Sequence, residues 1–297
     1  MFQTISLMKI IKSHILLFIA LTIIFLFLII THDNKKNSYN IPKNINKIVS
    51  LSPSITRQIV DLGAESLLVG VTRYHPPLKS KVSIIGSLIH PNIEKIVMLK
   101  PHIIFSSEHD NKIQFNERIK ESDLALYSFK RVNNFYSLCK NFMQLGKMLN
   151  KEKKSKELIE TYKLKLNQKL KLNRKYVIAM FISESPIMGI SNTSFIGNAI
   201  NKTGAINAFK DITFPYPLLS LEHIVLLNPD VVVSVTYNIK RKESDLKKVL
   251  KKVTKLKVNI RDSFYTIPAN DISYYTPSVY VKIVGYLKNI LSKEEKK

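Results

Sequence analysis

Cysteine, tryptophan and glycine are absent or scarce in this sequence, which excludes several kinds of covalent link and functional motif. The single cysteine, Cys139, rules out a disulfide within the chain and any metal site built from paired cysteines. There is no tryptophan, and the eight glycines are so few that the loops must rely on Asn, Ser and Pro. We find no glycine-rich phosphate loop, no Gly-x-Ser-x-Gly elbow and no metal-ligand spacing among the histidines. An enzyme is therefore not indicated, and neither a cofactor nor a protein-held metal is expected.

Acidic residues are also scarce, which gives a formal net charge of +24 from 46 Lys and Arg against 22 Asp and Glu. The lysine-rich runs at 151–175 and 241–257 carry apolar residues at helical spacing, so we interpret them as solvated helix faces. Nucleic-acid binding is therefore not expected. The positive net charge still favours an anionic ligand or an anionic membrane surface. The length of 297 residues and the 45% hydrophobic content are typical of one large or two ordinary globular domains.

One pattern occurs twice, at 92–106 and again at 220–234, an offset of 128 residues. The identical pairs are Glu94/Glu222, Ile96/Ile224, Val97/Val225, Leu99/Leu227, Pro101/Pro229 and Ser106/Ser234. The spacing of the apolar residues predicts a short helix, which the proline ends. The β-branched run after the proline predicts a strand buried on both faces, as in a parallel sheet. Two copies predict two similar lobes, although helix–proline–strand is common enough for a chance match.

An apolar run near the amino terminus predicts export. Lys9 and Lys12 precede the run at 15–30. We interpret residues 1–36 as an uncleaved anchor that enters the membrane through residues 10–31, or as a cleaved signal. No small-x-small cleavage site follows the run, and no cysteine is available there for lipid attachment.

The start of the chain leaves one choice open, because Met8 opens a signal as well as Met1 does. In either case the rest of the chain is predicted at the extracytoplasmic face of the cytoplasmic membrane, which is the periplasm. Residues 37–46 are polar and rich in asparagine, as suits a short tether.

Residues 47–149 are predicted to form an N-terminal lobe. A strand opens it at Lys47. A helix at 55–62 follows, with Ser54 as its N-cap. The further predicted elements are a strand at 67–71, a shaped loop at 72–90, the first copy of the repeat, a strand at 124–127 and a helix at 134–149.

Residues 150–173 are predicted to form an inter-lobe helix, and 174–297 a C-terminal lobe. A helix over about 151–172 would be about 33 Å long at 1.5 Å per residue, and would act as a stiff strut. The predicted elements after it are a strand from 175, a helix at 195–202, the second copy of the repeat, a basic helix near 243–253, a strand at 264–267 and a helix at 278–291. The predicted fold class is α/β, with two similar lobes, each with a mainly parallel sheet flanked by helices, joined by one long rigid helix.

Several blocks of sequence together resemble the ABC-importer solute-binding proteins for cobalamin, ferric siderophores and haem. They are KIVSLSPSIT, LGA and LVGVTRY within 47–74, NIEKIVMLKPHIIF at 92–105, LGKMLNKEKKSKELIETY at 145–162, NKTGAINAFKD at 201–211 and PYPLLSLEHIVLLNPDVVV at 215–233. The resemblance spans about 47–292. It implies two α/β lobes joined by a rigid helix, with a metal-chelate or corrinoid ligand held between them. It also implies a monomer that delivers this ligand to an ABC permease and its ATPase.

The resemblance carries over to particular residues. Glu94 and Glu222 match the glutamates that pair with arginines of the permease; the alternative is a helix-start glutamate favoured by the helix dipole. Tyr74 and Tyr216 match aromatic positions that face the ligand, and the alternative for each is a half-buried core aromatic. The remaining candidates, in loops that should reach the cleft, are Arg73, Leu88, Asp271, Tyr274 and Tyr275.

Three departures bear on the ligand. Leu88 stands where cobalamin-binding members have a tryptophan, which weighs against cobalamin. Arg57 stands at a position that is acidic in the family. Tyr74 and His75 are suitable donors to iron if the ligand is haem. The competing functions are an anchored sensor or scavenger without a permease and, least favoured, an enzyme on the same scaffold.

Overall fold

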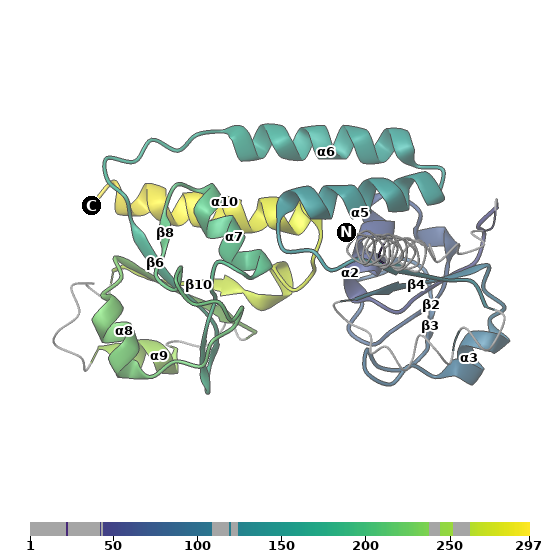
Figure 1. Ribbon diagram of the computed structural model, residues 1–297, viewed down its shortest axis with the longest axis horizontal. Helices are drawn as coiled ribbons and strands as arrows, with labels where there is room; N and C mark the ends of the chain where they lie inside the picture. The colour runs from purple at the N-terminus through teal and green to yellow at the C-terminus, as the bar shows by residue number, and fades with distance from the viewer. Residues whose placement is uncertain are drawn as a thin grey trace, which may run out of the picture. The chain divides into compact units, whose positions relative to one another are not determined.

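The structure is a computed structural model that describes residues 22, 42, 44–108, 119, 124–237, 244–251 and 262–297 (Figure 1). The chain divides into two compact units, Met1–Asn40 and Ile41–Lys297. The predicted anchor and most of the predicted tether lie outside the described residues. Within the part of the chain that is described, no helix combines the length and apolar character that a membrane span needs.

In the described part of the chain, five parallel strands form the first sheet, in the order β3-β2-β1-β4-β5. Their bounds are Ile48–Ser50 for β1, Leu68–Val71 for β2, Ser83–Ile84 for β3, Ile103–Ser107 for β4 and Leu126–Phe129 for β5. The central strands β1 and β4 are buried throughout, as expected when helices cover both faces of a sheet. Alternate residues supply two separate cores, with Ile48 and Phe105 in one and Val49 and Ile104 in the other.

The second sheet has the order β10-β9-β6-β7, and β8 also pairs with β6. Its strands are β6 (Val177–Glu184), β7 (Ile187–Gly189), β8 (Ile206–Asn207), β9 (Val231–Thr236) and β10 (Phe264–Pro268). The pairs β6–β8, β6–β9 and β9–β10 are parallel, whereas β7 runs antiparallel to β6. The expectation of two lobes with mainly parallel sheets is confirmed.

Helices flank both sheets. The described α-helices are α2 (Pro53–Asp61), α3 (Ile93–Met98), α5 (Phe135–Met148), α6 (Glu152–Asn167), α7 (Phe195–Lys202), α8 (Leu221–Leu227), α9 (Asp245–Leu250) and α10 (Pro277–Glu294). Two short 3₁₀ helices are η1 (Glu65–Leu67) and η2 (Ala269–Asp271). In Figure 1, α6 runs above α5 and α10, and it packs against both of them. It therefore joins the N-terminal sheet and its helices to the C-terminal ones.

The two copies of the repeat fold alike, as α3–β4 and α8–β9. Asn92 and Ser220 cap the two helices, each accepting a hydrogen bond from the backbone three residues on. A residue with positive φ follows each helix at the equivalent position, Lys100 with 46° and Asn228 with 42°. The buried proline and buried strand follow at the same register in both copies. The predicted helix, break and strand are confirmed.

The inter-lobe helix is shorter than its sequence pattern suggests. α6 ends at Asn167, so its 16 residues are about 24 Å long instead of the predicted 33 Å. Beyond it the chain is extended, and Leu170 and Leu172 both pack on the core of the second sheet. The ammonium group of Lys288 donates to the carbonyls of Leu166 and Gln168 and so caps the helix there. Packing of Leu170 and Leu172 on the second core thus ends the helix earlier than its local sequence pattern predicts.

A second difference concerns the start of α2. The N-cap is Ser52, with Pro53 in the first turn, and not Ser54 as the sequence suggested. The preference of proline for the first helical position explains the shift. As a result Ser54 lies within the helix, and its side chain contacts another part of the chain.

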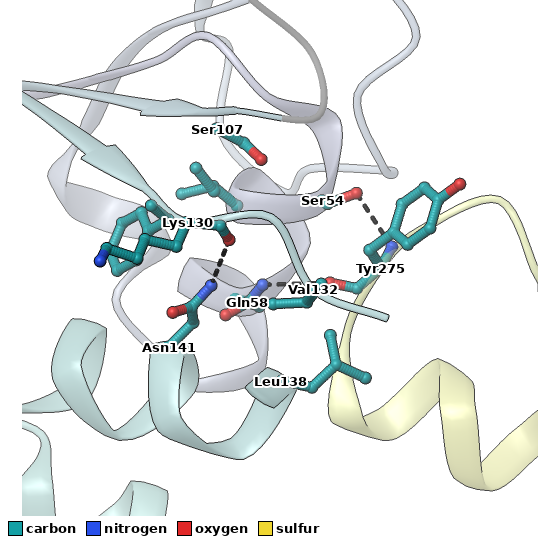
Figure 2. A pocket seen from close by; sticks show the side chains of 10 residues that line it. Ser54, Gln58, Ser107, Lys130, Val132, Leu138, Asn141 and Tyr275 are labelled. Carbon is teal, nitrogen blue, oxygen red and sulfur yellow. Dashed lines mark hydrogen bonds between the residues drawn. The ribbon is translucent and has the colours of Figure 1, made fainter. Parts of the chain in front are cut away.

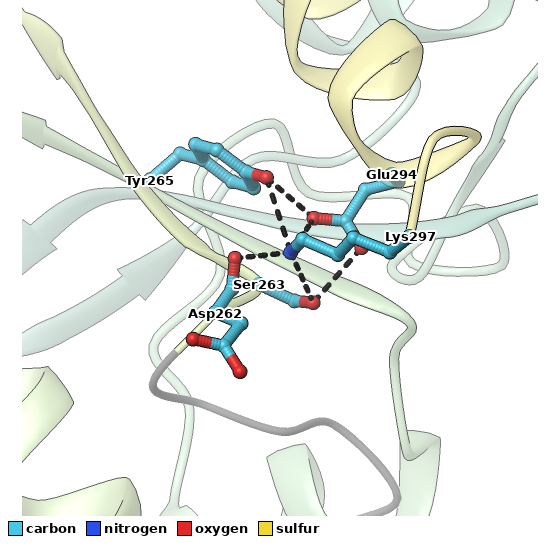
Figure 3. A network of polar contacts seen from close by, with 5 residues as sticks. All are labelled: Asp262, Ser263, Tyr265, Glu294 and Lys297. Carbon is cyan, nitrogen blue, oxygen red and sulfur yellow. Dashed lines mark hydrogen bonds and ion pairs between the residues drawn. The ribbon is translucent and has the colours of Figure 1, made fainter.

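The end of α10 is fixed to the start of β10 by a polar network (Figure 3). The Glu294 carboxylate, only 7% exposed, accepts hydrogen bonds from Ser263 and Tyr265 and pairs with Lys297. Burial raises the pKa of the Tyr265 hydroxyl, and the adjacent carboxylate adds to the rise. The hydroxyl therefore stays protonated and serves as a donor. This network holds the C-terminal helix against the second sheet.

Candidate functional site

Helix α2 of the first lobe is joined to the loop before α10 of the second lobe. The Tyr275 amide donates to Ser54 Oγ at 2.9 Å, and Gln58 Nε2 donates to the Tyr275 carbonyl at 3.2 Å (Figure 2). Ser278 Oγ donates to Asp61 Oδ2 at 2.6 Å. Residues 54, 58 and 61 share one face of the helix, since residues three and four apart are neighbours. We call this set of contacts the lobe junction.

A fourth residue of α2, Arg57, completes the lobe junction. Arg57 Nε donates to Asp61 Oδ1 at 2.8 Å, so Asp61 accepts from its own helix and from the other lobe. The Asp61 side chain is only 11% exposed, which makes this pairing stronger than one at the surface. Burial raises the pKa of nearby Tyr162, in α6, to about 12, and Asp61 adds to the rise. The lobe junction thus ties α2, α6 and α10 together.

The cavity at the lobe junction is too small for a chelate. It measures about 20 Å³, enough for about one water molecule. Figure 2 shows Ser54, Gln58 and Tyr275 on its wall, with Lys130 and Asn141 also lining it. The junction therefore connects the lobes and leaves no room for the expected chelate.

The carboxyl ends of the parallel strands are where open α/β sheets bind ligands. Arg73 and Tyr74 follow β2 directly, and both are exposed. Tyr74 has a φ of 68°, in the left-handed region that a bulky residue rarely adopts, and its side chain is 79% exposed. The structure thus holds an aromatic ring out in solvent on a strained backbone. Strain of this kind is concentrated at functional sites.

His75 lies beside this tyrosine with one ring nitrogen engaged. Its Nδ1 is 2.7 Å from the carbonyl of Pro76. Since a carbonyl can only accept, the neutral ring in this geometry carries its proton on Nδ1 and its lone pair on Nε2. No group of three or more His, Cys, Asp or Glu that would hold a metal occurs among the described residues.

The loop after β2 is shaped, as its sequence suggested. The Arg73 amide donates to the Gly86 carbonyl, and Gly86 has a φ of 115°. A Cβ at Gly86 would meet the His90 carbonyl oxygen at 2.5 Å, so the turn requires glycine. Leu88 lies half-buried within this turn. The loop backbone is therefore fixed where it carries Arg73 and Tyr74.

Two of the predicted tyrosines are brought together in the second lobe. The hydroxyls of Tyr216 and Tyr275 are 3.0 Å apart, and the Tyr275 ring packs on Phe195 with centroids 5.0 Å apart. Burial raises the pKa of Tyr216, and the neighbouring Tyr275 adds to the rise. The two half-buried residues thus form a hydrogen-bonded pair at the edge of the lobe junction.

Tyr274 connects this region with the first lobe electrostatically. Burial raises the pKa of Tyr274, while Arg57 of α2 lowers it and Tyr237 raises it further. Both groups therefore lie within electrostatic range of Tyr274. Tyr237 follows β9 and is 79% exposed. Sequence analysis missed it, although its place directly after the second repeat strand was a usable signal.

Asp271 is engaged within its own lobe. Its carboxylate pairs with Lys282 at 2.6 Å and accepts from the Tyr286 hydroxyl. Partial burial raises the pKa of Asp271, but the hydrogen bonds from Lys282 and Tyr286 outweigh burial and leave it lowered. It is therefore an ionised structural partner of α10.

Basic side chains gather after the strands of the first lobe. Arg73 follows β2, Lys130 and Arg131 follow β5, and all three are exposed. The Arg131 amide donates to the Glu108 carboxylate at 3.0 Å, and its guanidinium donates to the Glu108 carbonyl. Positive charge predominates at this edge, which suits an anionic group.

The two glutamates of the repeat lie elsewhere, in the first turns of α3 and α8. Both are exposed, and neither forms an ion pair with any residue that the structure describes. A hydrogen bond with Ser220 lowers the pKa of Glu222. Figure 1 shows α3 and α8 at opposite ends of the unit Ile41–Lys297, both on the side away from α6.

The chain belongs to the periplasmic binding protein family, whose model matches residues 48–255. A Bacillus subtilis relative, the uncharacterized ABC transporter substrate-binding lipoprotein YvrC, is 29% identical over 217 residues, which cover 69% of this chain and 68% of the relative. The vitamin B12-binding protein of Vibrio parahaemolyticus is 21% identical over 193 residues, which cover 63% of this chain and 70% of that one.

Solved structures share the fold. The periplasmic vitamin B12-binding protein BtuF of Vibrio cholerae superposes with a TM-score of 0.73 at 20% identity, covering 85% of this chain and 99% of that one. The periplasmic heme-binding protein HutB of the same species gives 0.71 at 17% identity, covering 82% and 98%. The predicted family and two-lobe α/β architecture are confirmed, and the family consists of solute-binding proteins.

Proposed function

We propose that this chain is an extracytoplasmic monomer that binds an iron chelate or a corrinoid between lobes 47–149 and 174–297 and delivers it to an ABC permease and its ATPase. Residues 150–173 join the lobes, and residues 10–31 anchor the chain in the membrane. The relatives and structural neighbours named for vitamin B12 and heme support this class of ligand. The name of the Bacillus relative supports an ABC importer.

The observation that carries the proposal is the strained, exposed Tyr74 at the carboxyl end of β2. A flat conjugated ligand such as haem or a corrin gains dispersion and stacking energy on such a ring. In this proposal Tyr237 and Tyr274 offer further aromatic surface from the second lobe. The proposal also assigns Leu88, Tyr216 and Tyr275 to the ligand surface, with Asp271 supporting it through its contacts with α10.

Charge favours an anionic ligand within this class. Arg73, Lys130 and Arg131 lie on the carboxyl edge of the first sheet, where carboxylates of haem or of a ferric siderophore would find partners. If the ligand is haem, either the Tyr74 phenolate or His75 Nε2 supplies the axial bond to iron.

The test is a thermal-shift panel on the full chain in detergent with haem, cobalamin and several ferric siderophores. A ligand at about 100 times its Kd adds about 2.7 kcal/mol of stability, a shift of a few degrees. We expect one class of ligand to stabilise the chain. No stabilisation across the panel would contradict the proposal.

Tyr74→Ala and Tyr136→Ala form a matched pair for the positive ligand. Tyr136 of α5 is 80% exposed, close to the 79% of Tyr74, but it lines a groove with Cys139 of α5 and Lys163 of α6. Tyr74→Ala should weaken binding at least tenfold, about 1.4 kcal/mol, with no change for Tyr136→Ala. Equal effects of the two would remove Tyr74 from the site.

The partner is tested separately through Glu94 and Glu222. In this proposal each carboxylate pairs with a cation of the permease, so Glu94→Gln with Glu222→Gln should abolish uptake and ATPase stimulation while ligand affinity stays unchanged. Retained uptake would contradict the pairing of these glutamates with the permease.

A further inference from the structure

One exposed apolar residue stands beside each repeat glutamate. Met98 in α3 is 80% exposed, and Leu226 in α8 is 82% exposed. The two occupy the same position of the repeat, 128 residues apart. Two residues earlier, Ile96 and Ile224 are fully buried at 0% exposure. The same short helix thus buries one apolar residue and presents another in each lobe.

Each of these residues follows its glutamate by four positions. Residues four apart are neighbours on one helix face, so Glu94 with Met98, and Glu222 with Leu226, form one surface patch per lobe. We call these the two tip patches. Each combines an exposed carboxylate with an exposed apolar side chain.

Further apolar groups surround the tip patches. In the first lobe, Ile84 is 40% exposed and lines with Met98 an open groove of about 290 Å³. In the second, Leu218 is 70% exposed and precedes the cap of α8 by two residues. Scattered exposed apolar residues are ordinary, but an equal pair at equivalent positions of two lobes is not scattered.

We propose that Met98 and Leu226 are docking anchors, which insert into apolar pockets on the two membrane subunits of the permease. This inference rests on the proposed function and adds the apolar half of the contact. A patch presented twice suits a partner that presents the same surface twice, as a symmetric or pseudo-symmetric dimer does. The position of α3 and α8 on one side of the unit lets one broad partner surface meet both (Figure 1).

The charged and the apolar side chain of each tip patch should affect different steps of binding. Exposed charges mainly set the association rate and its dependence on salt. Buried apolar anchors mainly set the dissociation rate, since they must leave a dry pocket. Met98 and Leu226 should therefore govern residence time, and the glutamates should govern association.

The first experiment places a photo-crosslinking benzophenone amino acid at 98, at 226 or at 164 in the full chain, in its native cells. Leu164 is 70% exposed and belongs to α6, which lies on the other side of the unit in Figure 1, so it is the matched control. We expect positions 98 and 226, but not 164, to crosslink to an ABC permease subunit identified by mass spectrometry. Crosslinks to lipid, to a second copy of this chain or to no permease would overturn the inference.

The second experiment measures binding of full-chain variants to that permease–ATPase complex in lipid nanodiscs. Met98→Gln and Leu226→Gln should each raise the dissociation rate about tenfold, and together about a hundredfold, with an unchanged salt dependence of association. Glu94→Gln and Glu222→Gln should lower the association rate and flatten its salt dependence. Leu164→Gln should match the unmodified chain.

The outcomes separate the inference from the proposed function. If Met98→Gln with Leu226→Gln binds as tightly as the unmodified chain while the glutamate variants bind weakly, the inference fails and the function stands. If the unmodified chain binds neither the permease nor any ligand of the thermal-shift panel, the proposed function itself fails.

Discussion

The two lobes share a scaffold but differ in the loops that it carries. Both build a capped helix, a residue with positive φ, a buried proline and a buried strand at the same register. After β2, however, the first lobe holds Tyr74 out in solvent, and the repeat offset gives the second lobe Lys202 in a helix there. The second lobe instead offers Tyr216 and Tyr275 bonded to each other. The repeat thus duplicates the tip patches, while the two lobes contribute different residues to the proposed ligand surface.

The largest predicted effect tests whether the shared scaffold is equally important in both lobes. Ile96→Ala and Ile224→Ala should each lower the free energy of unfolding by about 2–5 kcal/mol, because both side chains are fully buried under their sheets. Urea unfolding would measure both. A loss below about 1 kcal/mol in one copy alone would show that the two helices are not anchored alike.

The next prediction addresses the lobe junction. Asp61→Ala removes the acceptor shared by Arg57 and Ser278 and should lower the free energy of unfolding by about 1–3 kcal/mol. It should also increase relative motion of the lobes, seen as a larger radius of gyration in small-angle scattering. Asp211→Ala is the control, since that carboxylate pairs with Lys210 but is 85% exposed and should change stability by less than about 0.5 kcal/mol.

A smaller effect is expected in the loop after β2, where one substitution should raise stability and lower ligand affinity. Tyr74→Asn places a residue that tolerates the left-handed region where the tyrosine is strained, and should raise the free energy of unfolding by up to about 1 kcal/mol. Ligand affinity should fall in the same variant because the ring is lost. Lower stability together with unchanged affinity would contradict a functional role for the strain.

The smallest predicted effect concerns Glu222, in the tip patch of the second lobe. The pKa of Glu222 is lowered by its hydrogen bond with Ser220, so its contribution to stability is present at neutral pH and is lost as the pH falls through the lowered pKa. Glu222→Gln should therefore differ slightly from the unmodified chain at pH 7 and match it at about pH 3. Thermal midpoints at the two values would measure this. A difference that grows on acidification would contradict the assigned sign.

Local signals in the sequence predicted much of the scaffold. The proline after each repeat helix ends that helix as predicted, and Asn92, Asn134 and Ser220 cap their helices in the structure, because such signals act within a few residues of themselves. The β-branched runs likewise identified the buried repeat strands, and helical apolar spacing identified α5. Backbone hydrogen bonding and solvent exclusion operate at this range, so a pattern of neighbours suffices.

Only the tertiary structure decided how these pieces meet. Ser54, which a local reading made a cap, instead bonds Tyr275, and the other junction bonds join residues 217 apart in sequence. The end of α6 was set by a core that lies beyond the helix. The pairing of Asp271 and the nearness of Tyr237 to Tyr274 have no sequence pattern either. The sequence by itself determined the local elements, their order and the duplicated tips. Which side chains meet across the lobes depends on the path of the whole chain between them. A local sequence pattern does not specify that path.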